Sequence, residues 1–244
     1  MTKKADLPRN PGVPRRNNTQ QILNAAEKIF SAYGFAGARI DDIAKACDLP
    51  KANILYYFGS KEELYRATLQ RLLVGWLADA DQWISIKHTP AVGLEGYIRS
   101  KMAFSRSKPD ASRLFMHELL AGGERVRAFL DSTLREHVEQ KAVVFDYWHK
   151  QGLCAPVDST HFMFTLWSMT QAYADMQVQF AAVLGRRRLN IADFEKGIST
   201  ILQLAGSICL TEATADTPPQ TNQLVHDTTK ESKSPEKRNK NKRK

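Results

Sequence analysis

The sequence lacks long apolar runs. No stretch approaches the roughly 20 apolar residues that a transmembrane helix needs. The opening segment, MTKKADLPRNPG, has no apolar core of the kind that marks a secretory signal. We therefore expect no membrane partner, no secretion signal and a cytoplasmic protein.

Cysteine is scarce as well. Its three positions, Cys47, Cys154 and Cys209, lie far apart along the chain. An odd number at such wide spacing does not resemble a disulfide framework, and it fits buried or inert thiols in a reducing compartment. No CxxC motif or His/Cys cluster is present, so the sequence indicates no metal site.

The motifs of the common enzyme classes are missing too. There is no glycine-rich phosphate loop and no GxSxG sequence. The six histidines are scattered, and the neighbours His117 and Glu118 would point to different faces of a helix. The sequence therefore predicts a protein that is not an enzyme and that needs no cofactor.

The net charge of +9 is concentrated at the two ends of the chain. Residues 1–16 carry five basic residues and one acidic residue, and residues 211–244 carry eight basic and five acidic ones, which leaves +2 for residues 17–210. We expect a disordered basic arm over 1–16 and a disordered lysine-rich tail over 211–244. Basic arms are expected beside a polyanion, with a merely solubilising tail as the alternative.

Between these ends, apolar residues recur at helical spacing and no strand pattern appears. Three short helices are predicted over about 18–34, 40–47 and 51–58, followed by a long helix from Ser60 to about residue 85 that a capping box with Glu63 opens. Later helices are predicted over about 90–106, 109–122, 124–151, 158–185 and 191–210. The fold class is all-α, with an N-terminal three-helix helix-turn-helix domain over 17–62 and a C-terminal helical domain over 63–210.

Two short helices joined by a tight turn and braced by a third form a helix-turn-helix unit. Its second helix enters the major groove, so its outer face should carry hydrogen-bonding, small or ring side chains. Ile54 and Phe58 are expected to face inward, with Tyr56 intermediate. The side chains predicted to face outward toward DNA are Lys51, Ala52, Asn53, Leu55 and Tyr57.

Each outward position has a chemistry suited to DNA. Lys51 can donate to guanine and Asn53 can pair with adenine, whereas Leu55 suits a thymine methyl group. Tyr57 can reach a base or a phosphate. Phosphate contacts are expected from the opening of the next helix, at Ser60 and Lys61, and from Arg39 before the second helix. A generic small helical bundle with solvated charges is the alternative.

The stretches FSAYGFAGARIDDIA at 30–44 and ILYYFGSKEELY at 54–65 closely resemble the DNA-binding domain of the TetR family of bacterial repressors. The resemblance covers about residues 18–66. It implies a nucleoid-associated homodimer that binds double-stranded, palindromic operator DNA and that a ligand of the C-terminal domain releases. Leu55 departs from the tyrosine that many members carry, which weakens any inference of a tyrosine–phosphate contact there.

The predicted C-terminal domain contains aromatic side chains and a glutamine at helical spacing. In FTLWSMTQAYADMQ, the residues Trp167, Gln171 and Asp175 follow at four-residue steps with Tyr173 between them, and Trp76 lies on the long connecting helix. A buried amide among aromatic rings suits a planar heterocycle with C=O and N–H groups. A core or dimer interface, formed by the last two long helices, is the alternative reading of the aromatic residues.

The segments 95–123 and 167–175 resemble the pyrimidine-utilisation branch of the TetR family, which senses uracil. This resemblance implies uracil or a related small cyclic amide as the effector, with Trp76, Trp167 and Gln171 at matching pocket positions and no firm role for Tyr173 or Asp175. The alternatives are a regulator that senses another amide or heterocycle, an activator, or a protein that shapes DNA, although the small charge of 17–210 opposes the last.

Overall fold

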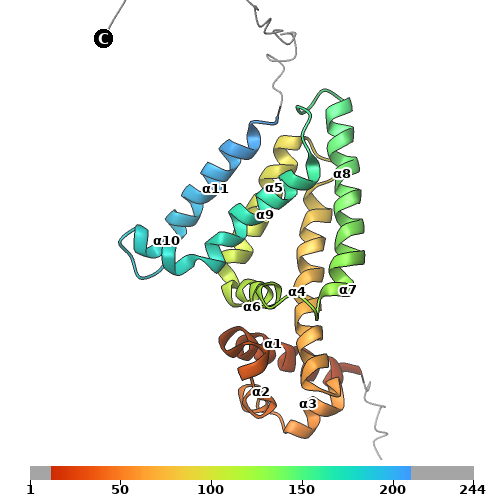
Figure 1. Ribbon diagram of the computed structural model, residues 1–244, viewed down its shortest axis with the longest axis vertical. Helices are drawn as coiled ribbons and strands as arrows, with labels where there is room; N and C mark the ends of the chain where they lie inside the picture. The colour runs from red at the N-terminus through yellow and green to blue at the C-terminus, as the bar shows by residue number, and fades with distance from the viewer. Residues whose placement is uncertain (1–11, 210–244) are drawn as a thin grey trace, which may run out of the picture.

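The computed structural model describes residues 12–209, with side chains from residue 17 onward. Within that range it is helical, as predicted, and contains no strand beyond one isolated bridge. Figure 1 shows a small domain at one end and a larger domain at the other, joined by a long helix. The elements are α1 (Gly12–Gly37), α2 (Ile40–Ala46), α3 (Lys51–Phe58), α4 (Lys61–Trp83), α5 (Pro90–Ser107), α6 (Pro109–Leu120), α7 (Arg127–Phe129), η1 (Leu130–Leu134), α8 (Arg135–Lys150), α9 (Ser159–Asp175), α10 (Gln177–Val183) and α11 (Ile191–Gly206).

The small domain packs α1, α2, α3 and the start of α4 around a core of fully buried side chains that includes Phe30, Ile43, Ile54 and Leu64. The turn between α2 and α3 is tight because Asp48 adopts a positive φ of 49° and Pro50 sets the first turn of α3. This arrangement is the predicted helix-turn-helix.

The helix α4 joins the two domains. Ser60 begins it by accepting a hydrogen bond from the Glu63 N–H at 3.1 Å, which is half of the predicted capping box. Its first half contributes Leu64 and Leu69 to the core of the small domain, and its second half contributes Ala80 to the core of the large domain. Any movement of α4 therefore involves both cores.

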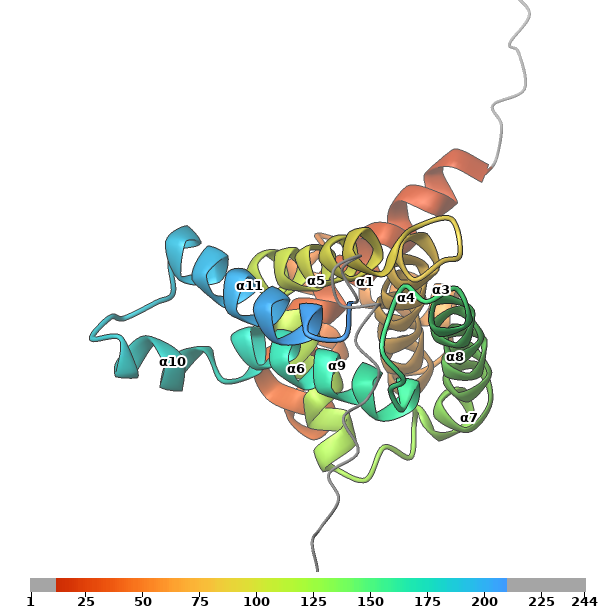
Figure 2. The ribbon, with the colours of Figure 1, turned by 90° about the horizontal axis from the view of Figure 1, so that it is seen from above.

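The large domain is built on α5, α8, α9 and α11, which surround a second core with the fully buried Trp148 at its centre. Seen from above, α8 lies beside α4, while α10 and α11 form the opposite edge (Figure 2). The helix α6 lies between the domains and packs on both α1 and α9.

Several helix boundaries differ from the sequence expectations. The helix α1 begins at Gly12, inside the segment 1–16 that was predicted to be disordered, and it breaks at the predicted position, Gly34. The predicted helix 124–151 is divided into α7, the π-helical turn η1 and α8, and the predicted helix 158–185 is divided at Met176. Residues 1–11 of the predicted arm and the whole predicted tail over 211–244 lie outside the described residues.

Two of the cysteines lie together in the structure, although they are far apart along the chain. Cys154, in the loop after α8, and Cys209, after α11, face each other across an antiparallel bridge. All three cysteines are free thiols.

Within the described residues no helix has the length and apolar character needed to span a membrane. The same residues hold no group of three or more His, Cys, Asp or Glu side chains that is arranged to bind a metal ion.

Close packing of α5 against the end of α4 leads to a stability prediction. A Cβ atom at Gly96 would lie 2.0 Å from the Trp83 ring, so Gly96→Ala should lower the free energy of unfolding by about 1–3 kcal/mol. Gly75→Ala is the control, because no atom lies within 4 Å of that position in α4 and alanine favours a helix. Urea unfolding of both variants measures the difference. Equal stability of the two would contradict the packing.

Candidate functional site

Most of the α3 side chains that were predicted to face DNA are accessible on the surface of the helix. Lys51, Ala52 and Leu55 are exposed and Asn53 is partly exposed, whereas Ile54 is fully buried. The helix is only two turns long because Pro50 precedes it and Gly59, with φ 73°, ends it. A short helix with one buried residue presents most of its surface to a partner.

The two tyrosines of α3 differ from the sequence prediction in their exposure to solvent. Tyr56, predicted to be intermediate, is 76% exposed. Tyr57, predicted to face outward, packs against the core of the small domain, and its hydroxyl accepts a hydrogen bond from Asn18 Nδ2 at 3.1 Å. The reason is the helical spacing of α3, because Tyr57 follows the buried Ile54 by three residues and shares its face, whereas Tyr56 lies on the opposite face. Tyr56 is therefore the tyrosine with the freer access to DNA.

The basic residues around α3 have weak partners. Lys51 Nζ lies 3.1 Å from Asp41 Oδ1, and both side chains are about half exposed, so water screens this pair and DNA can replace it. Lys61 Nζ donates to the Ala36 carbonyl at 3.3 Å and lies 4.7 Å from the centre of the Phe35 ring. Arg39 is exposed at the start of α2.

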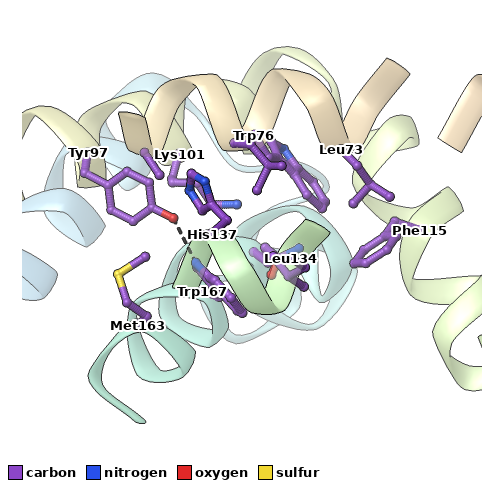
Figure 3. A pocket seen from close by; sticks show the side chains of 12 residues that line it. Leu73, Trp76, Tyr97, Lys101, Phe115, Leu134, His137, Met163 and Trp167 are labelled. Atoms are coloured by element: carbon purple, nitrogen blue, oxygen red, sulfur yellow. Dashed lines mark hydrogen bonds between the residues drawn. The ribbon is translucent and has the colours of Figure 1, made fainter. Parts of the chain in front are cut away.

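A cavity lies between α4, α5, α8 and α9 in the large domain, with α6 and η1 closing its end. It contains three of the five predicted ligand-binding residues, Trp76, Trp167 and Gln171. The cavity has a volume of about 60 Å³ that the centre of a water molecule could occupy. This is room for a small ring. Figure 3 shows Trp76 and Trp167 on different walls, with Lys101 and His137 reaching toward the same space.

Lys101 is the least expected member of this site. It is 3% exposed, and its ammonium lies 4.2 Å from the centre of the Trp76 ring. Burial lowers its pKa to about 8, although the negative charges of Asp79 and Asp175 oppose the change. No carboxylate among the described residues forms an ion pair with it. The cavity therefore holds a poorly hydrated hydrogen-bond donor without an anionic partner.

Two further polar atoms of the residues that line this cavity, Trp76 Nε1 and His137 Nε2, are buried without a hydrogen-bond partner among the described residues. The indole N–H of Trp76 can only donate. Burial lowers the pKa of His137, whose Nδ1 lies 3.7 Å from Asp81 Oδ1, so the ring is neutral at pH 7. An unpaired buried donor is costly, so these atoms indicate a site that a polar ligand completes.

Trp167 is held in place by Tyr97, a residue that was not among the predicted site residues. Trp167 Nε1 donates to the Tyr97 hydroxyl at 2.8 Å, a hydrogen bond that Figure 3 marks with a dashed line. Tyr97 itself is 2% exposed. Burial raises the pKa of Tyr97, which keeps the hydroxyl neutral. The ring of Trp167 is therefore a fixed wall of the cavity. The signal that could have indicated Tyr97 is its position on the apolar face of α5, one turn before Lys101.

Tyr173 and Asp175 lie outside the cavity. Tyr173 packs between α10 and α11, with its ring centre 5.3 Å from Phe180 and 5.6 Å from Phe194. Asp175 Oδ1 accepts a hydrogen bond from Ser112 Oγ at 2.7 Å, and burial raises its pKa. Four-residue steps drift by about 40° each around a helix. The row that begins at Trp167 has therefore turned from the cavity toward α6 when it reaches Asp175.

The junction between the domains is built around Arg125. Its guanidinium lies 3.9 Å from the centre of the Phe35 ring in α1, and its Nη1 lies 3.5 Å from Glu118 Oε2 at the end of α6. Glu118 is almost fully buried and also accepts a hydrogen bond from the backbone N–H of Arg125 at 3.0 Å. The end of α6 is thus fastened to the DNA-binding domain.

Comparison with known proteins agrees with this architecture. Residues 22–68 match the family described as bacterial regulatory proteins of the tetR family, and residues 69–212 match the C-terminal region of YcdC-like proteins. The HTH-type transcriptional regulator RutR of Escherichia coli K12 is 37% identical over 183 residues, which are 75% of this chain and 86% of RutR.

Solved structures show the same fold. AibR in complex with isovaleryl coenzyme A and operator DNA superposes with a TM-score of 0.61 at 20% identity, covering 78% of this chain and 99% of AibR. The ketosteroid transcriptional regulator KstR2 of Mycobacterium tuberculosis superposes with a TM-score of 0.62 at 16% identity, covering 79% of this chain and 95% of KstR2. This chain belongs to the TetR family of bacterial transcriptional regulators, and it is a DNA-binding regulator and not an enzyme.

Proposed function

We propose that the protein is a repressor that binds a palindromic operator as a homodimer and is released by uracil or a closely related pyrimidine. The observation that carries the proposal is the cavity beside α4, where the Trp76 indole N–H, the Lys101 ammonium and the Gln171 amide lie among aromatic rings. The similarity to RutR over most of the chain supports the same class of regulator.

The chemistry of the cavity suits a pyrimidine-dione. Uracil carries two carbonyl oxygens and two N–H groups on a flat ring. Trp76 Nε1 and Lys101 Nζ supply donors for a carbonyl, and the Gln171 amide supplies a donor and an acceptor together. The ring of Trp167, held by Tyr97, offers an apolar face. The small volume favours one ring over the two fused rings of a purine.

The proposed dimer uses the edge formed by α10 and α11. Val178 and Val183 are 84% and 81% exposed there, and Leu204 in α11 is 58% exposed. Apolar side chains gathered on one edge favour a protein partner over water. A second copy of the chain would repeat α3 at the spacing that a palindromic operator requires.

The path from the cavity to DNA follows α4 and α6. Trp76 packs against Phe104 and against Phe115 of α6, with ring centres 5.5 and 5.2 Å apart. A ligand that moves the Trp76 ring therefore acts on α4 directly and on α6 through Phe115. Both helices contact α1, and the Arg125 junction fastens the end of α6 to Phe35. The expected result is a change in the separation of the two α3 helices of the dimer.

Tryptophan fluorescence tests the ligand class. Two of the four tryptophans, Trp76 and Trp167, line the cavity, so a bound ring should change the emission in a saturable way. Uracil and thymine are expected to produce this change, and adenine and guanine are not. A saturable response to a purine with none to uracil would contradict the pyrimidine proposal while leaving the DNA-binding function intact.

Lys101→Met is predicted to stabilise the free protein and to weaken uracil binding. In the folded protein the pKa of Lys101 is about 8, below its ordinary value of 10.5. Burial of the charged ammonium therefore lowers the free energy of unfolding by its full amount below pH 8, and this loss disappears as the pH rises toward 10.5. Removing the charge should raise the free energy of unfolding at pH 7 by something of the order of 3 kcal/mol. The loss of a charged donor should weaken uracil binding by about 10- to 100-fold.

Thermal unfolding and calorimetric titration of uracil measure the two effects of Lys101→Met. Lys150→Met is the matched control, because Lys150 is exposed at the end of α8 and away from the cavity. Unchanged uracil affinity in Lys101→Met would show that this lysine does not contact the ligand.

A further inference from the structure

Cys154 and Cys209 occupy facing positions in an antiparallel bridge between the loop after α8 and the chain that follows α11. The Ala155 N–H donates to the Ile208 carbonyl at 2.8 Å, so this hydrogen bond joins the neighbours of the two cysteines and not the cysteines themselves. In Figure 1 the end of α11 and the loop between α8 and α9 meet at the same end of the large domain.

This register suits a disulfide. In an antiparallel pair whose own backbone groups are not hydrogen-bonded to each other, the Cα atoms lie about 4.5 Å apart and the side chains are close. Disulfides span Cα separations of about 4.4–6.8 Å. A pair in this register therefore has the Cα separation that a bond between the two sulfur atoms requires.

The surroundings assign different roles to the two thiols. Cys154 is fully buried, whereas Cys209 is partly exposed, so a reagent in solution reaches Cys209 first. Burial raises the pKa of both thiols, and the nearby Cys209 raises that of Cys154 further. The third thiol, Cys47, is buried in the core of the small domain, where its Sγ donates to the Ala44 carbonyl at 3.5 Å.

We propose that Cys154 and Cys209 form a dithiol that small disulfides such as oxidised glutathione convert reversibly into an intramolecular disulfide. The Cys209 thiolate attacks one sulfur of the oxidant and releases one glutathione thiolate. The Cys154 thiolate then attacks Cys209 Sγ in this mixed disulfide and releases the second glutathione. The protein loses two electrons and two protons, and the oxidant is reduced to two thiols. This proposal does not depend on the identity of the effector.

The bond would tie the loop after α8 to the end of α11 across roughly 55 residues of chain. Closing a loop of that length restricts the unfolded chain and leaves the folded backbone in place. The oxidised protein should therefore unfold at a higher temperature than the reduced protein, by about 5–10 °C.

Thiol counting on the full-length protein tests the proposal. Reduced protein is treated with oxidised glutathione, denatured and alkylated with N-ethylmaleimide, and its mass is then measured by mass spectrometry. We expect the number of alkylated thiols to fall from three to one, with Cys47 as the remaining thiol and a linked peptide pair that contains Cys154 and Cys209. Dithiothreitol should restore all three thiols and the lower unfolding temperature.

Serine variants provide the controls. Cys47→Ser should go from two alkylated thiols to none, whereas Cys154→Ser should keep a glutathione adduct on Cys209 and form no internal link. Three free thiols after oxidation, a link that includes Cys47, a bond between two chains, or a lasting glutathione adduct on wild-type Cys209 would each overturn the proposal.

Discussion

Gln171→Ala is expected to bind operator DNA as tightly as the wild-type protein and to stay bound when uracil is added. The side chain lies in the cavity of the large domain, far along the chain from the α3 surface, so its loss leaves the DNA-binding residues unchanged. In the proposed complex its amide pairs with both a C=O and an N–H of the ligand. Leaving two buried polar groups unpaired costs about 1–3 kcal/mol each, so uracil affinity should fall by roughly 100-fold or more.

The measurement for Gln171→Ala is an operator-release titration with uracil, followed by fluorescence anisotropy of labelled DNA. Gln140→Ala is the matched control, because Gln140 is exposed on α8 and should respond like the wild-type protein. Normal release of Gln171→Ala by uracil would place the ligand elsewhere. Loss of operator binding in the absence of uracil would indicate a structural role for Gln171.

Asn53→Ala and Lys61→Ala are expected to weaken DNA binding in different ways. Asn53 lies on the partly exposed surface of α3, where its amide can pair with a base edge. Its loss should cost about 1–3 kcal/mol at the operator, which is about 5- to 150-fold in affinity, with little effect on unrelated DNA. Lys61 contacts phosphate in this account, so its loss should weaken all sequences alike and reduce the salt slope by about one.

Binding of both variants to operator and unrelated DNA at several salt concentrations separates the two roles. Lys51→Ala should resemble Asn53→Ala, since the exposed pair with Asp41 gives way easily to DNA. Equal losses on operator and unrelated DNA for Asn53→Ala would contradict a base contact from α3.

The sequence was sufficient to predict the helix-turn-helix because its signals are local. Gly34, Pro50 and Gly59 divide the segment into short helices, and the apolar spacing places Ile54 inside, as the structure confirms. The same spacing places Tyr57 on the buried face, three residues after Ile54, and Tyr56 on the exposed face, so the sequence prediction for these two residues was wrong although the signal was present. The hydrogen bond from Asn18 to Tyr57 was not predictable in this way, because it joins residues 39 positions apart.

The ligand cavity was predictable only in part for the same reason. Trp76, Trp167 and Gln171 were found by residue type and resemblance, and the structure places them around one cavity. Lys101 looks like an ordinary surface lysine in sequence, and its burial appears only when α4 and α9 close over α5. The approach of Cys154 to Cys209 is likewise a product of tertiary packing, because no local pattern relates the two positions.

The most direct test of the proposed function is an anisotropy titration of the purified protein on the DNA upstream of its own gene, with and without uracil, thymine and a purine panel. We expect specific binding at physiological salt that uracil or thymine releases and purines do not. Specific binding that none of the pyrimidines affects would contradict the proposed effector, and weak binding without sequence preference would contradict the operator-binding role.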